Sequence, residues 1–157
     1  MRSQSKWLLM AALPVIAASL IGNAATMPAI PVWYAGLIKP WFNPPNWIFG
    51  PVWTTLYALM IWAFWQVLRA PADHPHRKIA IIIFLAQIAT NALWSIVFFG
   101  LHQIGIAVLV STALLLLVIA TVIFFYRVDR LAAWAVAPTI AWVSFATFLN
   151  ATIWRLN

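Results

Sequence analysis

The sequence contains no cysteine and almost no acid: among its 157 residues there are two carboxylates, Asp73 and Asp129. Without cysteine the chain forms no disulfide, and thiol catalysis, iron–sulfur clusters and cysteine-ligated zinc are excluded. Charged residues of either sign make up 7% of the chain, far below the share in a soluble domain. General acid–base catalysis therefore lacks candidates, because both carboxylates stand beside arginines and are expected to pair with them.

The sequence is instead rich in apolar residues. They make up 66% of the sequence, and the mean hydropathy is +0.97, which indicates an integral membrane protein. The net charge of +7 would suggest a nucleic-acid partner in a soluble protein. Here the cations stand beside apolar segments, where they orient the chain and meet anionic headgroups. We therefore expect a lipid bilayer as partner and no nucleic acid.

Five apolar runs without charge have the length of a membrane-spanning helix, about 20 residues. They cover residues 7–26, 47–68, 79–101, 104–126 and 131–154. They predict an all-α fold, a bundle of five transmembrane helices in one domain over residues 1–157. The first connection, residues 27–46, is longer than a link between two helices requires, and long ordered loops are usually functional.

The first run has an alternative interpretation. Arg2 and Lys6 precede an apolar stretch that ends at Gly22-Asn23-Ala24, which resembles a signal peptide with a small-residue cleavage site. The run is long for a signal peptide, so we favour a retained helix. One of its faces carries mostly small residues and predicts close packing on another helix in lipid; the residues are Ala11, Val15, Ala18, Gly22 and Thr26.

Lysine and arginine are distributed unevenly over the two sides of the predicted bundle. One side holds the seven cations at positions 2, 6, 69, 77, 78, 127 and 130, and the other side holds the two at positions 39 and 155. The positive-inside rule then predicts a cytoplasmic N-terminus and a periplasmic C-terminus, if the protein is a multi-pass protein of a bacterial inner membrane.

The predicted spans contain no Asp, Glu, Lys, Arg or His. Ion-coupled transporters and pumps normally place such groups inside the membrane, so this class is disfavoured. The pair His74 and His76 is read as solvated loop histidines in preference to metal ligands, and we predict no metal site. If the protein bound haem, the iron would need an axial ligand such as His, Cys, Met or Tyr. Within the spans, Tyr57 and Met60 are the candidates for this role.

Residues 33–57, WYAGLIKPWFNPPNWIFGPVWTTLY, combine tryptophan and proline at high density. The pair Pro44-Pro45 fixes two φ angles and removes two backbone donors, so the run before Trp47 should be extended and stiff. Pro51 falls in the first turns of the next helix, where proline is tolerated. The segment predicts a rigid aromatic lid over a helix end, with Lys39 as its one cation.

Polar and aromatic residues share one face of the third and fifth predicted helices. One interpretation is hydrogen bonding between helices, because buried amides such as Asn91 and Asn150 need partners in lipid. The other is a pocket with aromatic walls, to which Trp53 adds a third side and in which a small residue leaves room for a flat ligand. The two faces consist of Gln87, Asn91, Trp94 and Phe98, and of Trp142, Ala146, Leu149 and Ile153.

Residues 33–57 resemble the signature of the translocator protein family, also called tryptophan-rich sensory or peripheral benzodiazepine receptor-like proteins. The matching patterns are Trp-Tyr-x-x-Leu-x-Lys-Pro and Pro-Pro-x-Trp-x-x-x-Pro-x-Trp-x-x-Leu-Tyr. Two later stretches match as well, and the resemblance spans nearly the whole chain. They are Gln87-x-x-x-Asn91-x-x-Trp94 with Phe98-Phe99-Gly100, and Ala141-Trp142-x-x-Phe145-Ala146-Thr147-x-Leu149-Asn150 with Trp154-Arg155.

The resemblance implies a five-helix membrane protein that binds tetrapyrroles, protoporphyrin IX above all, in a pocket beneath the first loop. It implies a translocator or sensor of bacterial type. The sterol-binding motif of animal members requires a tyrosine, and this sequence has none between Leu149 and Arg155. No cofactor is required, and a homodimer is expected. By motif position, with Asn91 added from its helix face, the ligand-binding residues are Trp47, Phe49, Gly50, Val52, Trp53, Asn91, Trp94, Ile106, Leu109, Trp142, Ala146 and Leu149.

Two other functions remain as alternatives to tetrapyrrole binding. The first is light-dependent porphyrin breakdown, which the resemblance assigns to some relatives and for which Trp53 and Trp142 would be the reactive indoles. The second is transport of a small solute across the membrane. The ligand's carboxylates are expected near Lys39, at the membrane interface.

Overall fold

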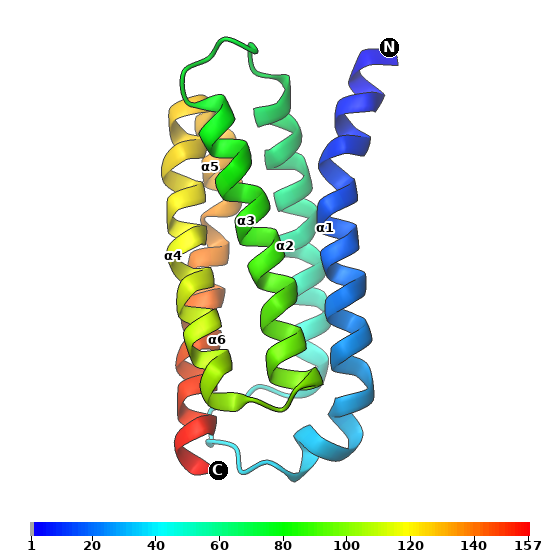
Figure 1. Cartoon of the computed structure of the whole chain (residues 1–157), viewed down its shortest axis with the longest axis vertical. Coiled ribbons are helices and arrows are strands. Elements are labelled where there is room, and N and C mark those ends of the chain that lie inside the picture. Colours follow the sequence, from blue (N-terminus) through cyan, green and yellow to red (C-terminus); the bar gives the residue numbers. More distant parts are fainter. Residues whose placement is uncertain (1) are drawn as a thin grey trace.

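In a computed structural model, which describes residues 2–157, all regular structure is helical (Figure 1). The elements are α1 (Arg2–Ala29), the π-helical turn η1 (Ile30–Tyr34), α2 (Asn46–Arg69), α3 (Arg77–Ser95), the π-helical turn η2 (Ile96–Gly100), α4 (Ile104–Val128), α5 (Arg130–Val136) and α6 (Pro138–Leu156). They form five helices long and apolar enough to cross a membrane. The predicted fold class is confirmed.

The first helix is longer than predicted. Helical structure continues past Met27 through η1 to Gly36, and the non-helical part of the first connection is residues 37–45. The prolines Pro28 and Pro31 cannot donate a backbone hydrogen bond, but the wider π turn absorbs this defect, and the Ala35 N–H closes it on the Ile30 carbonyl. The predicted loop at 27–46 was therefore too long, because the sequence alone did not reveal the π turn.

The fifth predicted helix is divided at Ala137 into α5 and α6. Pro138 is the first residue of α6, where its missing N–H and fixed φ are tolerated. The Ala137 N–H still donates to the Ala133 carbonyl at 2.9 Å. The two segments remain one apolar stretch, Arg130–Leu156, that is long enough to span the membrane.

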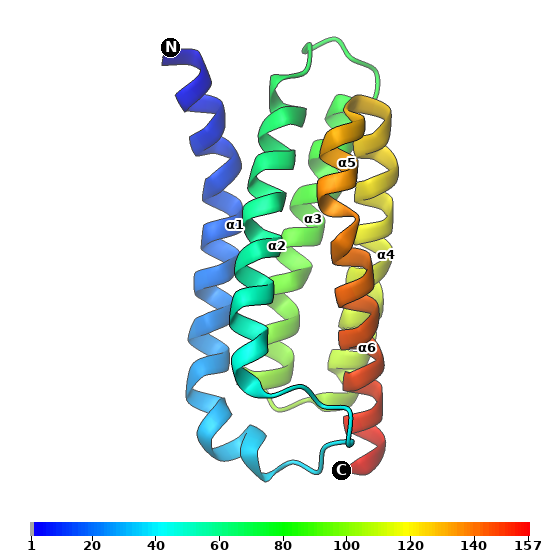
Figure 2. The same ribbon diagram turned by 180° about the vertical axis from the view of Figure 1, so that it is seen from behind.

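The helices run side by side along the long axis of the molecule (Figures 1 and 2). α1 packs against α2 and α3, α4 packs against α3, α5 and α6, and α2 packs against α5. The N-terminus and the α2–α3 turn lie at one end, and the C-terminus and the first connection lie at the other. On α1 the predicted packing face is buried at Ala11, Val15 and Ala18, as expected for small residues at a helix interface in lipid.

Asn150 joins three helices at the C-terminal end of the bundle. Its Oδ1 accepts a hydrogen bond from Trp94 Nε1 of α3 at 3.0 Å, and its Nδ2 donates to the Ile104 carbonyl of α4 at 3.1 Å. The side chain is 2% exposed. Both halves of the amide are therefore satisfied, and Asn150 serves the interhelical hydrogen bonding that its position in lipid demands.

We predict that Asn150→Leu destabilises the bundle by about 1–2 kcal/mol, because it leaves Trp94 Nε1 without a partner and removes the link from α6 to the Ile104 carbonyl of α4. Equilibrium unfolding in detergent, followed by helical circular dichroism, measures the loss. Thr152→Val is the matched control, since the exposed Thr152 hydroxyl bonds only to the Phe148 carbonyl of its own helix. Equal stability of the two variants would contradict the prediction.

Candidate functional site

A cavity of about 470 Å³ lies between α1, α2, α3 and α6, in the half of the bundle that holds the C-terminus. Its volume falls within the range of small-molecule sites, about 300–1,000 Å³. The lining is mostly aromatic and aliphatic, with a few hydroxyl and amide groups. Its residues are Ser19, Gly22, Asn23, Thr26, Met27, Ile30, Tyr34, Asn46, Trp47, Phe49, Gly50, Trp53, Thr54, Tyr57, Asn91, Trp94, Ser95, Phe98, Phe99, Trp142, Ala146, Leu149, Asn150 and Ile153.

Small residues keep this space open. A Cβ atom added to Gly50 would meet no atom within 4 Å, whereas one added to Gly22 would lie 3.2 Å from Ser95 Oγ. Gly22 therefore allows α1 to approach α3 closely, and Gly50 adds no bulk at the wall of the cavity. Ala146 on α6 likewise contributes one methyl group beside the larger aromatic side chains.

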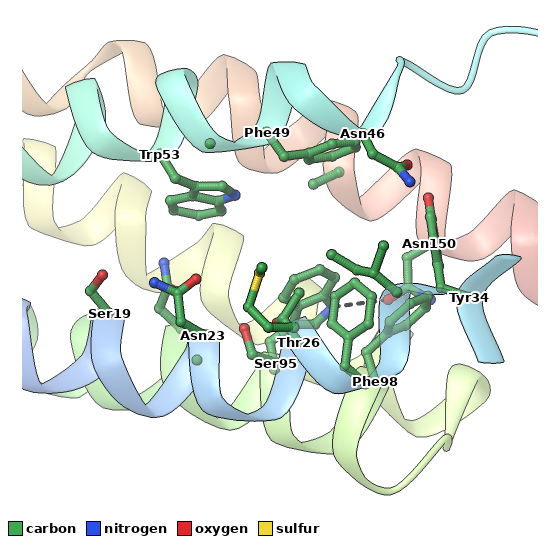
Figure 3. Close-up of a pocket in the computed structure, with 18 of the residues that line it drawn as sticks. Ser19, Asn23, Thr26, Tyr34, Asn46, Phe49, Trp53, Ser95, Phe98 and Asn150 are labelled. Atoms are coloured by element: carbon green, nitrogen blue, oxygen red, sulfur yellow. Dashed lines mark hydrogen bonds between the residues drawn. The ribbon is translucent and has the colours of Figure 1, made fainter. Parts of the chain in front are cut away.

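The aromatic walls are held by contacts between rings. Phe49 of α2 meets Trp142 of α6 edge to face at 5.7 Å between centroids. Trp53 lies 5.3 Å from Tyr57 at an interplanar angle of 31°. In Figure 3 the side chains of Phe49 and Trp53 extend from α2 toward α1, which presents Ser19, Asn23 and Thr26 on the opposite side. The cavity thus has flat apolar surfaces on one side and a polar strip on the other.

Two donors among the lining residues have no hydrogen-bond partner in the described part of the chain. Asn91 accepts from the Tyr57 hydroxyl at 3.1 Å through Oδ1, but its Nδ2 is buried and unpaired, and so is Trp142 Nε1. A buried donor without a partner costs about 1–3 kcal/mol. Neither nitrogen exposes surface to the cavity, so the cavity favours a ligand through its flat aromatic walls and not through these two donors.

Nine of the twelve residues predicted to bind a ligand line this cavity. They come from three helices that the sequence separates by up to 100 residues, and the fold brings them together. They are Trp47, Phe49, Gly50, Trp53, Asn91, Trp94, Trp142, Ala146 and Leu149.

The other three, Val52, Ile106 and Leu109, lie outside the cavity. Val52 is half-buried and packs against the main hydrophobic core of the bundle. Ile106 and Leu109 are 53% and 71% exposed on the outer face of α4. The prediction placed α4 beside the ligand, but α4 packs behind α3 and α6 and contributes no described lining residue. These three assignments are corrected: the side chains face the core or the lipid.

One wall of the cavity, formed by α1, was not predicted from the sequence. Ser19, Asn23 and Thr26 recur at i, i+4 and i+7 in an otherwise apolar helix, and all three line the cavity. Thr26 had been placed on the packing face together with Gly22. The polar spacing was visible in the sequence and would have identified this wall, because a polar stripe in a membrane helix needs a partner or a cavity.

The first connection, residues 37–45, is fastened to the C-terminal end of α6. The Ile38 N–H donates to Asn157 Oδ1, and Asn157 Nδ2 donates to the Ile38 carbonyl, both at 3.0 Å. Phe42 stacks on Phe148 with centroids 5.4 Å apart. Tyr34 and Asn46, which flank the connection, line the cavity. The connection is therefore an ordered strap across the end of the site.

Lys39 was expected to lie near the carboxylates of a ligand, but its ammonium group bonds to the protein backbone. Its ammonium group donates to the Leu37 carbonyl at 3.0 Å and lies 4.7 Å from the centroid of the Tyr34 ring. It thereby neutralises carbonyl groups at the end of the first helix, where a cation is favourable. The residue is not part of the cavity lining.

The candidate iron ligands lie in different surroundings. Met60 is fully buried and accepts a hydrogen bond from Gln87 Nε2 at 3.7 Å, outside the cavity. Tyr57 lines the cavity, but its hydroxyl donates to Asn91. His102 stacks on Trp33 at 4.2 Å between centroids, and His74 and His76 belong to the turn at the other end of the bundle.

The sequence is similar to several known proteins over most of its length. The protein named CrtK from Rhodobacter capsulatus is 39% identical over 125 residues, which cover 80% of this chain and 78% of that protein. Tryptophan-rich protein TspO from Archaeoglobus fulgidus is 37% identical over 153 residues, 92% of this chain and 93% of its own. The human translocator protein is 38% identical over 130 residues, 80% and 75% of the two chains. A profile of the TspO/MBR family matches residues 10–155, and the chain therefore belongs to the TspO/MBR family.

Proposed function

We propose that the protein binds a tetrapyrrole, with protoporphyrin IX as the reference ligand, in the cavity between α1, α2, α3 and α6, and acts as a membrane sensor or translocator. The observation that carries the proposal is a cavity of about 470 Å³ with indole and phenyl walls that include Phe49, Trp53 and Trp142. The names of relatives, translocator protein and tryptophan-rich sensory protein, support the class of function.

A tetrapyrrole matches the chemistry of the lining. Its flat faces bury against aromatic side chains such as Trp53 and Trp142. Its acidic edge stays at the mouth, where the exposed residues Asn23 and Asn46 line the cavity. Burying the carboxylates in an uncharged cavity would cost far more than this placement.

Sensing and translocation differ in whether the ligand crosses the membrane. Uptake of protoporphyrin IX into reconstituted vesicles supports translocation, and binding without uptake supports sensing. For a bacterial inner membrane we propose a cytoplasmic N-terminus and a periplasmic C-terminus, since seven of the nine cations lie on the N-terminal side. The expected homodimer remains a prediction.

We predict that Ala146→Leu weakens protoporphyrin IX binding about 10- to 100-fold, because the larger side chain fills the cavity at a cost of about 1–3 kcal/mol. Titration of the purified protein by tryptophan fluorescence quenching measures the affinity. Ala141→Leu is the matched control, since Ala141 is exposed on the same helix and does not line the cavity. Similar affinities for both variants would place the ligand elsewhere.

Metal-free protoporphyrin IX is predicted to bind at least as tightly as haem. Haem proteins usually supply a His, Cys, Met or Tyr ligand. The described lining contains no histidine, both of its tyrosine hydroxyls already donate to asparagines, and Met27 is its one methionine, without a second strong ligand for bis-axial coordination. Parallel titrations and the absorption spectrum of bound haem test this. A six-coordinate low-spin spectrum that disappears on mutation of His74, His76 or His102 would refute it.

Light-dependent breakdown of the bound porphyrin is a second candidate function, favoured by the presence of both Trp53 and Trp142 in one cavity. The double variant Trp53→Phe/Trp142→Phe keeps apolar ring faces and loses the oxidisable indoles. We predict binding within about tenfold of the unmodified protein and slower loss of porphyrin absorbance under illumination. Unchanged photochemistry would exclude these two indoles, and dark controls separate breakdown from release.

A further inference from the structure

A second hollow lies on the outer surface between α4 and α5, at the end of the bundle that holds the N-terminus. Its volume is about 340 Å³ and its walls are almost entirely apolar. It is separate from the cavity, with which it shares no residue. We call it the α4–α5 groove; it is lined by Val122, Ile123, Tyr126, Arg127, Ala133, Trp134 and Ala137.

The shape of this groove follows from residue size. Ala133 and Ala137 recur at i and i+4 at its base, and Ala133 is 2% exposed. Tyr126 and Trp134, which are 48% and 69% exposed, form taller sides. Small side chains between large aromatic ones leave a channel that faces the hydrocarbon of the membrane, since both helices belong to spans.

Two arginines stand at the rim without an acidic partner. Arg127 lies 5.5 Å from the centroid of the Phe124 ring, and Arg130 lies 5.3 Å from that of Tyr126. Neither makes a hydrogen bond or an ion pair with another described residue. Arg69 and Arg77 at the same end of the bundle differ, since each donates a hydrogen bond within the chain.

The nearest carboxylate, Asp129, is engaged elsewhere. Its Oδ1 accepts from the Ala132 N–H at 2.8 Å and caps the first turn of α5. The expected pairing of Asp129 with a neighbouring arginine is not found among the described residues, where its one side-chain hydrogen bond is this cap. Two guanidinium groups remain at the boundary between a membrane span and its loop, where lipid phosphates lie.

We propose that the α4–α5 groove binds one anionic phospholipid, with an acyl chain between Tyr126 and Trp134 and the phosphate at Arg127 and Arg130. An anionic lipid combines the two features that the groove requires, an apolar chain and a negative group at the interface. Guanidinium groups suit phosphate because they donate hydrogen bonds in pairs. Basic sites between membrane helices bind anionic headgroups in the same manner.

The test counts lipids on the purified protein by native mass spectrometry after incubation with equal amounts of phosphatidylglycerol and phosphatidylcholine. We expect the protein to retain one phosphatidylglycerol in preference to phosphatidylcholine. In Arg127→Gln/Arg130→Gln its affinity should fall about tenfold or more, since each cation near a membrane surface adds about a factor of five. Lys6→Gln/Lys78→Gln removes the same charge from the same end and should retain the lipid.

A third variant tests the acyl-chain position independently of charge. Ala137→Leu narrows the groove and should lower the affinity for phosphatidylglycerol while both arginines remain. Helical circular dichroism of every variant provides the folding control, and the groove shares no residue with the cavity. The proposal is overturned if the arginine and lysine double variants lose the lipid equally, or if Ala137→Leu has no effect, since either result would mean attraction to surface charge alone.

Discussion

Inside a membrane no water is present to pair with backbone and side-chain polar groups, so each of them needs a partner within the protein. The hydroxyls of Thr90, Thr112 and Thr121 meet this demand through carbonyls of their own helices. Asn150 meets it between helices. Pro31 has no N–H to donate, and around it the helix widens into the π turn η1, in which the Ala35 N–H donates to the Ile30 carbonyl. The long first helix and the position of the site both follow from this constraint.

The same constraint makes the exceptions informative. Asn91 Nδ2 and Trp142 Nε1 are buried donors without partners, and both residues belong to the lining of the cavity. Asn150 lines the same cavity but is fully paired. Two amides that look alike in the sequence thus have different roles: Asn150 holds α3, α4 and α6 together, and Asn91 joins α3 to α2 by accepting from the Tyr57 hydroxyl. Their distinction depends on the direction of each side chain in the folded bundle.

The number and type of spans followed from the sequence because long uncharged apolar runs have few alternatives in a membrane. Much of the cavity followed from helical spacing and motif position, as with Trp53, Trp94 and Trp142. Ile106 and Leu109 were assigned by motif position alone, and a motif position does not say which face of α4 meets a neighbouring helix; both side chains lie on its exposed face. The end of the first helix was misplaced because proline normally marks a boundary.

Charge is distributed so that the two proposed sites select their ligands by different forces. The described lining of the cavity carries no Asp, Glu, Lys, Arg or His, so shape, ring stacking and single hydrogen bonds have to discriminate there. Lys39, the nearest cation in the strap, is occupied by backbone carbonyls. The α4–α5 groove has the opposite balance, with few polar atoms along its walls and Arg127 at its rim. Ionic strength should therefore weaken lipid binding at the groove and leave stacking in the cavity nearly unchanged, because screening acts on exposed charges and not on buried apolar contacts.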